Sequence, residues 1–299
     1  MVTAQQRILP RRARQYLTAY SFLIPYLAFY VTFVLLPVLW SFYLSLCKGG
    51  LLSGTEFIGF QNYIKAWNNS LFIRALQNTA YYTLLVVPLA MLSSLTLALL
   101  IDKMAPFWQN VVKSALFLPM VSSVVSLSII WKAIFIPDRN GPLNTLVGVF
   151  GIPPQNWLGN PDLVIPSIVG FEIWRGYGFW VIVFLAGLDA IPNDLYEAAR
   201  VDGANAWHIL TRITLPLLRP TFLFLLVMGF IWNFQLFDAV YMLTAGGPAN
   251  ASATVVWYVY RNAFHFENLG FAATMGVLLL FIILILTVLQ LKYIPSEVD

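Results

Sequence analysis

The chain has 299 residues, of which 60% are hydrophobic and only 10% are charged, and its formal net charge is +4. An average soluble domain carries roughly 25% charged residues, so this composition excludes a soluble fold of this length and requires that much of the surface face lipid. One cysteine and two widely separated histidines exclude a disulfide framework and a Cys/His metal cluster, and the modest positive charge does not indicate nucleic-acid binding.

Six apolar segments are long enough to cross a membrane as helices, which takes about 20 residues each. They cover residues 20–46, 76–101, 111–135, 164–188, 221–243 and 269–291. The segments are too long and too uniformly apolar for barrel strands, and open strands would leave backbone groups unpaired in lipid. The sequence therefore predicts an all-α integral membrane protein with one six-helix domain over 20–291. A basic tail (1–19) would precede it and a short C-terminal tail (292–299) would follow.

The distribution of Lys and Arg predicts the orientation of these helices. The side that holds both termini and the 102–113 and 189–219 loops carries ten positive residues, four of them in the basic tail. The opposite side carries six. No cleavable signal peptide is evident. Both termini are therefore expected to be cytoplasmic in a multi-pass protein of a cell membrane.

The cytoplasmic loop at residues 189–219 reads as two short helices that meet at an angle. Asp194 and Glu197 fit a capping box at the start of the first helix. Gly203 is placed to adopt a positive φ and end that helix. Asn205 can cap the second helix, which Pro216 is expected to end.

One face of the second short helix carries Trp207, Leu210 and Thr214, because residues three, four and seven positions apart lie on the same side of a helix. The residues alone support two interpretations equally. The loop is either an amphipathic connector that lies in the lipid headgroups or an elbow on which another protein docks.

The order of residues in this loop resembles the signature loop of bacterial binding-protein-dependent importer permeases: Glu197-Ala198-Ala199, then Gly203, then Ile213-Thr214-Leu215-Pro216. The resemblance implies that the loop inserts into a cleft on a partner ATPase and couples nucleotide turnover to helix movement. The coupling contacts it implies are Glu197, Ala198, Ala199, Asp202, Gly203, Trp207, Ile213, Leu215 and Pro216. Leu210 stands where the family often has an aromatic residue, and this difference would weaken the contact with the ATPase without removing it.

Other segments are similar to the carbohydrate branch of these ABC importer permeases, the maltose and glycerol-phosphate type first permeases. They are the runs 57–63 and 131–141 in the outer loops and 243–248 after the fifth span. The resemblance covers roughly residues 10–295 and implies a type I importer bundle for a sugar or sugar-like solute. The implied partners are a homologous second permease, two ATP-binding cassette subunits and an extracytoplasmic solute-binding protein.

The sequence contains no Gly-x4-Gly-Lys-Ser/Thr loop that could cradle nucleotide phosphates. ATP and Mg are therefore expected on the partner subunits. For this chain we expect no enzymatic activity, no cofactor and no metal.

Polar side chains at membrane depth are costly and are candidates for a transport site. Glu172 and Arg175 lie in the fourth span, where their spacing of three residues lets them meet. Asn233, Gln235 and Asp238 lie in the fifth span. Two explanations of Glu172 and Arg175 are equally good: an ion pair that only fixes helix packing, and contact with a solute.

Alignment with the family implies sugar contacts at positions in both spans. Their chemistry is suitable, since aromatic rings suit the apolar faces of pyranoses and polar groups suit their hydroxyls. The implied contacts are Glu172, Arg175, Gly176 and Phe179 in the fourth span and Gly229, Trp232, Asn233 and Leu236 in the fifth. Glu172 and Arg175 replace residues that are apolar in the family, which argues against maltose itself.

Two other functions fit a polytopic membrane protein. An ion-coupled secondary transporter would work without ATPases, but its usual signs, an internal repeat and acid clusters at the midplane, are not visible. A membrane-embedded enzyme would need convergent His, Asp or Ser residues, and only scattered ones occur. The sequence leaves the solute open among a disaccharide, an oligosaccharide and a glycerol phosphate.

Overall fold

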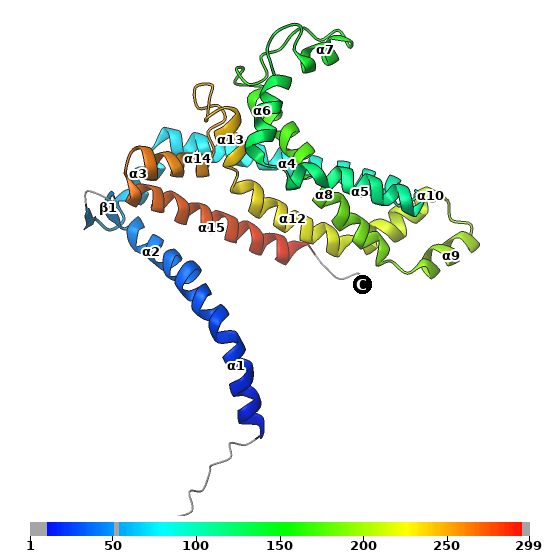
Figure 1. Cartoon of the computed structure of the whole chain (residues 1–299), viewed down its shortest axis with the longest axis horizontal. Coiled ribbons are helices and arrows are strands. Elements are labelled where there is room, and N and C mark those ends of the chain that lie inside the picture. The colour runs from blue at the N-terminus through cyan, green and yellow to red at the C-terminus, as the bar shows by residue number, and fades with distance from the viewer. Residues whose placement is uncertain (1–10, 51–53, 295–299) are drawn as a thin grey trace, which may run out of the picture.

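The computed structural model describes residues 11–50 and 54–294 (Figure 1). Residues 1–10 of the predicted basic tail and 295–299 of the C-terminal tail lie outside this range. Four helical segments are long and apolar enough to span a membrane singly: Tyr20–Ser45, Ser70–Ile101, Val164–Asp189 and Leu269–Tyr293. They correspond to the predicted first, second, fourth and sixth spans, with ends shifted by at most a few residues, except that the second begins six residues earlier than predicted.

The predicted third span is not one helix. It consists of α5 (Pro106–Val121) and α6 (Val124–Ile134), whose axes differ by 98°. Pro119 lies in the last turn of α5, and Ser122 adopts an extended backbone whose N–H bonds back to the Pro119 carbonyl. Proline lacks an N–H for the helix ladder, so a turn that contains it is a weak point at which the helix ends. The expectation of a continuous helix over 111–135 was therefore wrong.

The predicted fifth span is also broken. α12 (Arg219–Phe234) ends at Gln235, and the short helix α13 (Asp238–Leu243) begins after an irregular segment of three residues. Thr254 donates a hydrogen bond of 2.8 Å to the Leu236 carbonyl, which satisfies a backbone group that the break leaves without a helical partner. The expectation of one helix over 221–243 was wrong near its C-terminal end. A second bend, of 59°, separates Ala206–Leu217 from α12, and counting this pair and the α5–α6 pair as one span each gives up to six spans in the described residues.

Short elements connect several of the spans. An antiparallel hairpin, β1 (Cys47–Gly50) with β2 (Gly54–Phe57), leads into α3 (Gln61–Trp67). The later connecting elements are α7 (Pro142–Gly148), α14 (Val255–Tyr260) and the π-helical turn η3 (Arg261–His265). The prediction contained only helices and loops, so the hairpin was missed.

The bundle is built around α4 (Ser70–Ile101) and α8 (Val164–Asp189), which lie side by side (Figure 1). Tyr82, Phe171 and Phe184 are almost fully buried in this core. A Cβ atom on Gly178 of α8 would lie 2.5 Å from the Leu116 carbonyl oxygen, so glycine permits the close approach of α5.

The first span diverges from the bundle. It comprises α1 (Arg11–Tyr30), the π-helical turn η1 (Val31–Leu35) and α2 (Leu36–Ser45), and it contacts α15 (Leu269–Tyr293) only near its end (Figure 1). None of its strongly apolar window is buried within this chain. Lipid or another subunit must therefore cover it.

Candidate functional site

The loop between the fourth and fifth spans forms the expected helical elbow. α9 (Asn193–Val201) ends at Gly203, which has φ +80°, and the Ala204 N–H bonds to the Ala199 carbonyl at 2.9 Å. Asn205 caps α10 (Ala206–Ile209) by accepting a 2.9 Å hydrogen bond from the His208 N–H. The predicted positive φ at Gly203 and the predicted cap at Asn205 are both confirmed.

Two details of the elbow differ from expectation. α9 begins at Asn193 after Pro192, and no side chain caps it, so the capping box of Asp194 and Glu197 does not form. Pro216 does not end the second helix. The chain continues through the π-helical turn η2 (Leu210–Thr214) into α11 (Leu215–Leu217) and bends by 59° before α12. Pro216 is the second residue of α11, directly after the π-helical turn.

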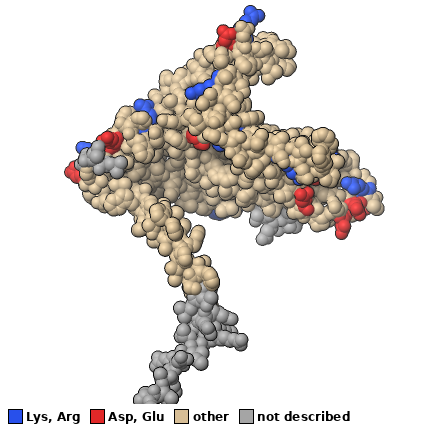
Figure 2. Space-filling view, viewed as in Figure 1, with Lys and Arg blue, Asp and Glu red and all other residues tan. Residues whose placement is uncertain are grey.

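The face formed by Trp207, Leu210 and Thr214 exists as expected, because all three line one hollow of about 690 Å³ with Tyr196 and Arg200. The Tyr196 hydroxyl lies 3.3 Å from the Thr214 hydroxyl and joins the two arms of the elbow. Both signs of charge occur at this end of the molecule (Figure 2).

The implied coupling residues fall into two groups by exposure. Those that project outward are Glu197, Ala198, Asp202, Gly203 and Trp207, and those that are half-buried are Ala199, Ile213, Leu215 and Pro216. The first group is accessible to another protein, whereas the second is partly covered by the rest of this chain.

A cavity of about 210 Å³ lies within the bundle, between α4, α5, α8 and the α12–α13 break. Seven of the eight residues implied as sugar contacts line it: Glu172, Arg175, Gly176, Phe179, Trp232, Asn233 and Leu236. The eighth, Gly229, lies outside the lining. A Cβ on Gly229 would lie 2.6 Å from the Trp180 ring, so this position permits close packing and offers no surface to the cavity.

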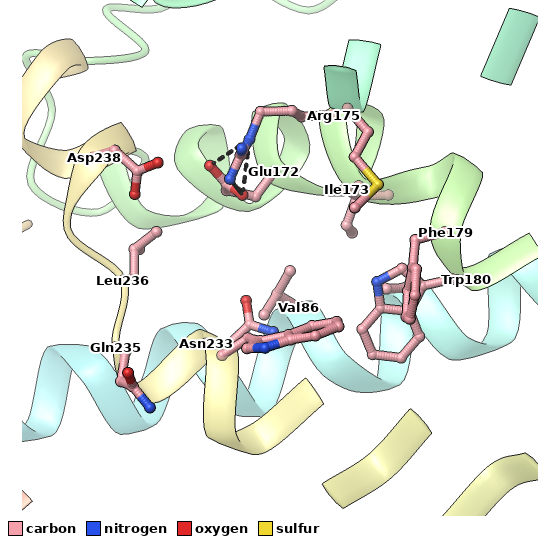
Figure 3. A pocket seen from close by; sticks show the side chains of 14 residues that line it. Val86, Glu172, Ile173, Arg175, Phe179, Trp180, Asn233, Gln235, Leu236 and Asp238 are labelled. Atoms are coloured by element: carbon pink, nitrogen blue, oxygen red, sulfur yellow. Dashed lines mark hydrogen bonds and ion pairs between the residues drawn. The ribbon is translucent and has the colours of Figure 1, made fainter. Parts of the chain in front are cut away.

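One wall of the cavity carries charge. Arg175 Nη2 lies 2.8 Å from Glu172 Oε2, and Arg175 Nε donates to both carboxylate oxygens at 3.2 and 3.3 Å. The two side chains are 24% and 10% exposed, respectively. Asp238, the first residue of α13, lies on the same side of the cavity as this pair (Figure 3). The predicted pairing of Glu172 with Arg175 is therefore confirmed, and a third charge joins it.

The opposite wall carries two amides, Asn233 and Gln235 (Figure 3). Asn233 Oδ1 accepts a 2.9 Å hydrogen bond from the buried Tyr82 hydroxyl, and Asn233 Nδ2 donates to the Gly229 carbonyl at 2.7 Å. A primary amide has two N–H groups and two lone pairs, so one of each is left to face the cavity. Tyr82 is thus a positioning residue for Asn233.

Aromatic rings line the remaining side. The rings of Phe179 and Trp232 meet edge to face, with centroids 5.1 Å apart, and Trp180 is adjacent. The cavity thus combines ionic groups, amides and ring surfaces, which together can bind a polyhydroxylated molecule. Within residues 11–50 and 54–294, no group of three His, Cys, Asp or Glu residues could hold a metal ion.

Several lining residues were not identified from the sequence. Val86 and Ala90 of α4, Met120 of α5 and Trp180 of α8 are apolar and carry no signal that separates them from core residues. Gln235 and Asp238 were recognised as polar groups at membrane depth, but only the break in the fifth span places them beside the other site residues.

Comparisons with known proteins agree with this architecture. The family model described as "Binding-protein-dependent transport system inner membrane component" matches residues 94–296. The arabinooligosaccharides transport permease AraP of Bacillus subtilis is 34% identical, over 91% of this chain and 87% of the relative. The lactose permease LacF of Rhizobium radiobacter is also 34% identical, over 90% and 91%. The sulfoquinovosyl glycerol permease SmoG of Agrobacterium fabrum is 32% identical, over 99% and 98%.

Among solved structures, a chain of a bacterial alginate ABC transporter in complex with its alginate-bound periplasmic protein superposes with a TM-score of 0.82. The match covers 94% of this chain and 95% of that one, at 24% sequence identity. The likeness confirms the predicted type I importer permease fold.

Proposed function

The chain belongs to the family of inner-membrane components of binding-protein-dependent transport systems, and from that premise we propose that it carries a sugar or sugar-like solute into the cell. It is a multi-pass membrane protein and the permease subunit of an ATP-driven importer. The observation that carries the proposal on the solute is the cavity within the bundle, where seven implied contact residues from two spans converge. Alternating access would expose this cavity to each side of the membrane in turn.

The solute class rests on the cavity chemistry together with the relatives. The Phe179 and Trp232 rings provide apolar surface, while Asn233, Glu172 and Arg175 provide hydrogen-bonding groups. The relatives named above handle arabinooligosaccharides, lactose and sulfoquinovosyl glycerol. A saccharide or glycoside is the chemistry that these proteins share.

The partners proposed are a homologous second permease, two ATP-binding cassette subunits and an extracytoplasmic solute-binding protein. The exposed residues of the α9–α10 elbow offer the ATPases a docking surface. The uncovered first span offers lipid or the second permease a contact. ATP and Mg would be bound by the ATPase subunits, so this chain would transport without catalysing a reaction.

The proposal is tested with the purified complex in proteoliposomes that contain ATP. We expect binding-protein-dependent accumulation of a labelled neutral oligosaccharide, no accumulation with an ATPase subunit unable to hydrolyse ATP, and none of a labelled amino acid. Uptake that follows an ion gradient without the ATPases would instead favour the ion-coupled secondary transporter. ATP-driven uptake of amino acids but no saccharide would refute the solute class.

We further propose that both termini are cytoplasmic in a bacterial inner membrane. The native Cys47 is only 1% exposed, so a thiol reagent would reach it poorly. A cysteine at Ser53 is a second possible probe, but Ser53 lies outside the described residues, so the exposed Thr55 of β2 is the better position. In a Cys47→Ala background, we expect a membrane-impermeant thiol reagent to label Thr55→Cys in spheroplasts. The matched variant Lys103→Cys, exposed between α4 and α5, should be labelled only after permeabilisation. The reverse pattern would overturn the orientation.

A further inference from the structure

The cavity carries three ionisable side chains from this chain: Glu172, Arg175 and Asp238. Glu172 and Arg175 neutralise each other through the 2.8 Å ion pair. Two carboxylates and one guanidinium leave one net negative charge, and that charge belongs to Asp238.

Asp238 is not neutralised elsewhere. Its carboxylate makes no hydrogen bond or ion pair with any residue in the part of the chain that the structure describes. Lys132 and Arg261 line a separate hollow together with Tyr241, so the nearby outer cations belong to another surface.

We infer that Asp238 makes this side of the cavity electronegative, so that the importer accepts neutral or cationic sugar-like solutes and rejects those that carry a carboxylate, phosphate or sulfonate. The inference rests on the proposed function and narrows its solute class. It separates this chain from similar proteins that handle acidic solutes: the alginate importer, and the permease SmoG, whose sulfoquinovosyl solute carries a sulfonate.

Neutral and anionic solutes interact differently with the wall formed by Glu172, Arg175 and Asp238. A sugar hydroxyl can donate a hydrogen bond to Asp238 or Glu172, and hydrogen bonds to a carboxylate are stronger than those between neutral groups. An anionic group must approach two carboxylates, and the only guanidinium in the lining is already held by Glu172. Because Glu172 is only 10% exposed, this repulsion is screened less than it would be at an open surface.

The electrostatic potential inside the cavity can be measured without knowing which solute is transported. Met120 lines the cavity and is 40% exposed, so Met120→Cys in a Cys47→Ala background supplies a thiol there. Cationic trimethylammonium-ethyl and anionic sulfonato-ethyl methanethiosulfonate would each be reacted with the purified full importer during ATP turnover. The ratio of the two rates, divided by the ratio measured for a free thiol, reports the potential of the whole cavity, including any groups from a partner.

We expect the cationic reagent to be favoured in the parent protein, and Asp238→Asn to lower the normalised ratio about five- to thirtyfold. The matched control Asp162→Asn removes an exposed carboxylate from the outer loop and should change the ratio less than about twofold. If Asp238→Asn fails to assemble, Asp238→Ser and the parent ratio provide the same test.

A parent ratio that favours the anionic reagent, or a ratio that Asp238→Asn leaves unchanged, overturns the inference. Failure of Met120→Cys to react with either reagent overturns it as well, because the cavity would not be open to polar solutes. The proposed function has its own readout, since ATP-driven uptake of neutral saccharides can persist in each of these cases.

Discussion

Gly203→Val is expected to lower solute-stimulated ATP hydrolysis by the assembled importer by on the order of tenfold, while the chain still inserts into the membrane. Gly203 joins the two arms of the elbow with φ +80°, a conformation that a β-branched residue adopts only with strain. Such strain is of order 1–3 kcal/mol, and about 1.4 kcal/mol already shifts an equilibrium tenfold. The second arm would then leave its orientation, and the ATPase contact would be lost.

The effect of backbone strain in Gly203→Val can be distinguished from the effect of a steric clash. An added Cβ there meets no atom within 4 Å, so side-chain bulk by itself is tolerated within this chain. Gly203→Asn is the matched control, because asparagine adopts positive φ readily, and it should retain most of the stimulated activity. Copurification of the ATPase subunits measures docking directly. Normal coupling in Gly203→Val would count against the docking role of the elbow, whereas equal loss in both variants would assign the effect to bulk at the interface.

Removal of either member of the Glu172–Arg175 pair should severely impair assembly. The two side chains are 10% and 24% exposed, and an unpaired charge at such a position costs about 3–5 kcal/mol. Glu172→Gln and Arg175→Met, made singly, should therefore reduce the amount of complex recovered from membranes. The single variants do not distinguish a structural pair from a solute contact, because both roles predict this loss.

The double variant, Glu172→Gln with Arg175→Met, separates the two roles because it removes both charges at nearly constant volume. We expect assembly to recover while ATP-driven uptake stays lower by on the order of tenfold or more, since a hydrogen bond to a charged group contributes about 1.5–3 kcal/mol. Uptake is measured in proteoliposomes with purified binding protein. Near-normal uptake by the assembled double variant would leave a structural ion pair and remove Glu172 and Arg175 from the solute site.

The membrane class, most of the spans and the geometry of the elbow follow from the sequence, because each depends on residues close together in the chain. A run of about 20 apolar residues satisfies its own backbone as a helix in lipid. Gly203 and Asn205 act on the backbone within three residues of themselves, and the structure confirms both. The ion pair of Glu172 with Arg175 likewise needs only one turn of helix. The capping box failed because Pro192 and Asn193 begin α9 earlier than the pattern indicated.

The cavity was decided by tertiary structure. The break between α12 and α13 depends on Thr254, whose hydroxyl bonds the carbonyl of Leu236, 18 residues earlier in the chain. Asn233 is oriented by Tyr82, 151 positions earlier. Apolarity alone predicts a continuous fifth helix, whereas an irregular segment at membrane depth is stable only when distant groups satisfy its backbone. The same break brings Asp238 to the wall that Glu172 and Arg175 occupy, so the net charge of the cavity is a property of the packed helices that no local pattern in the sequence contains.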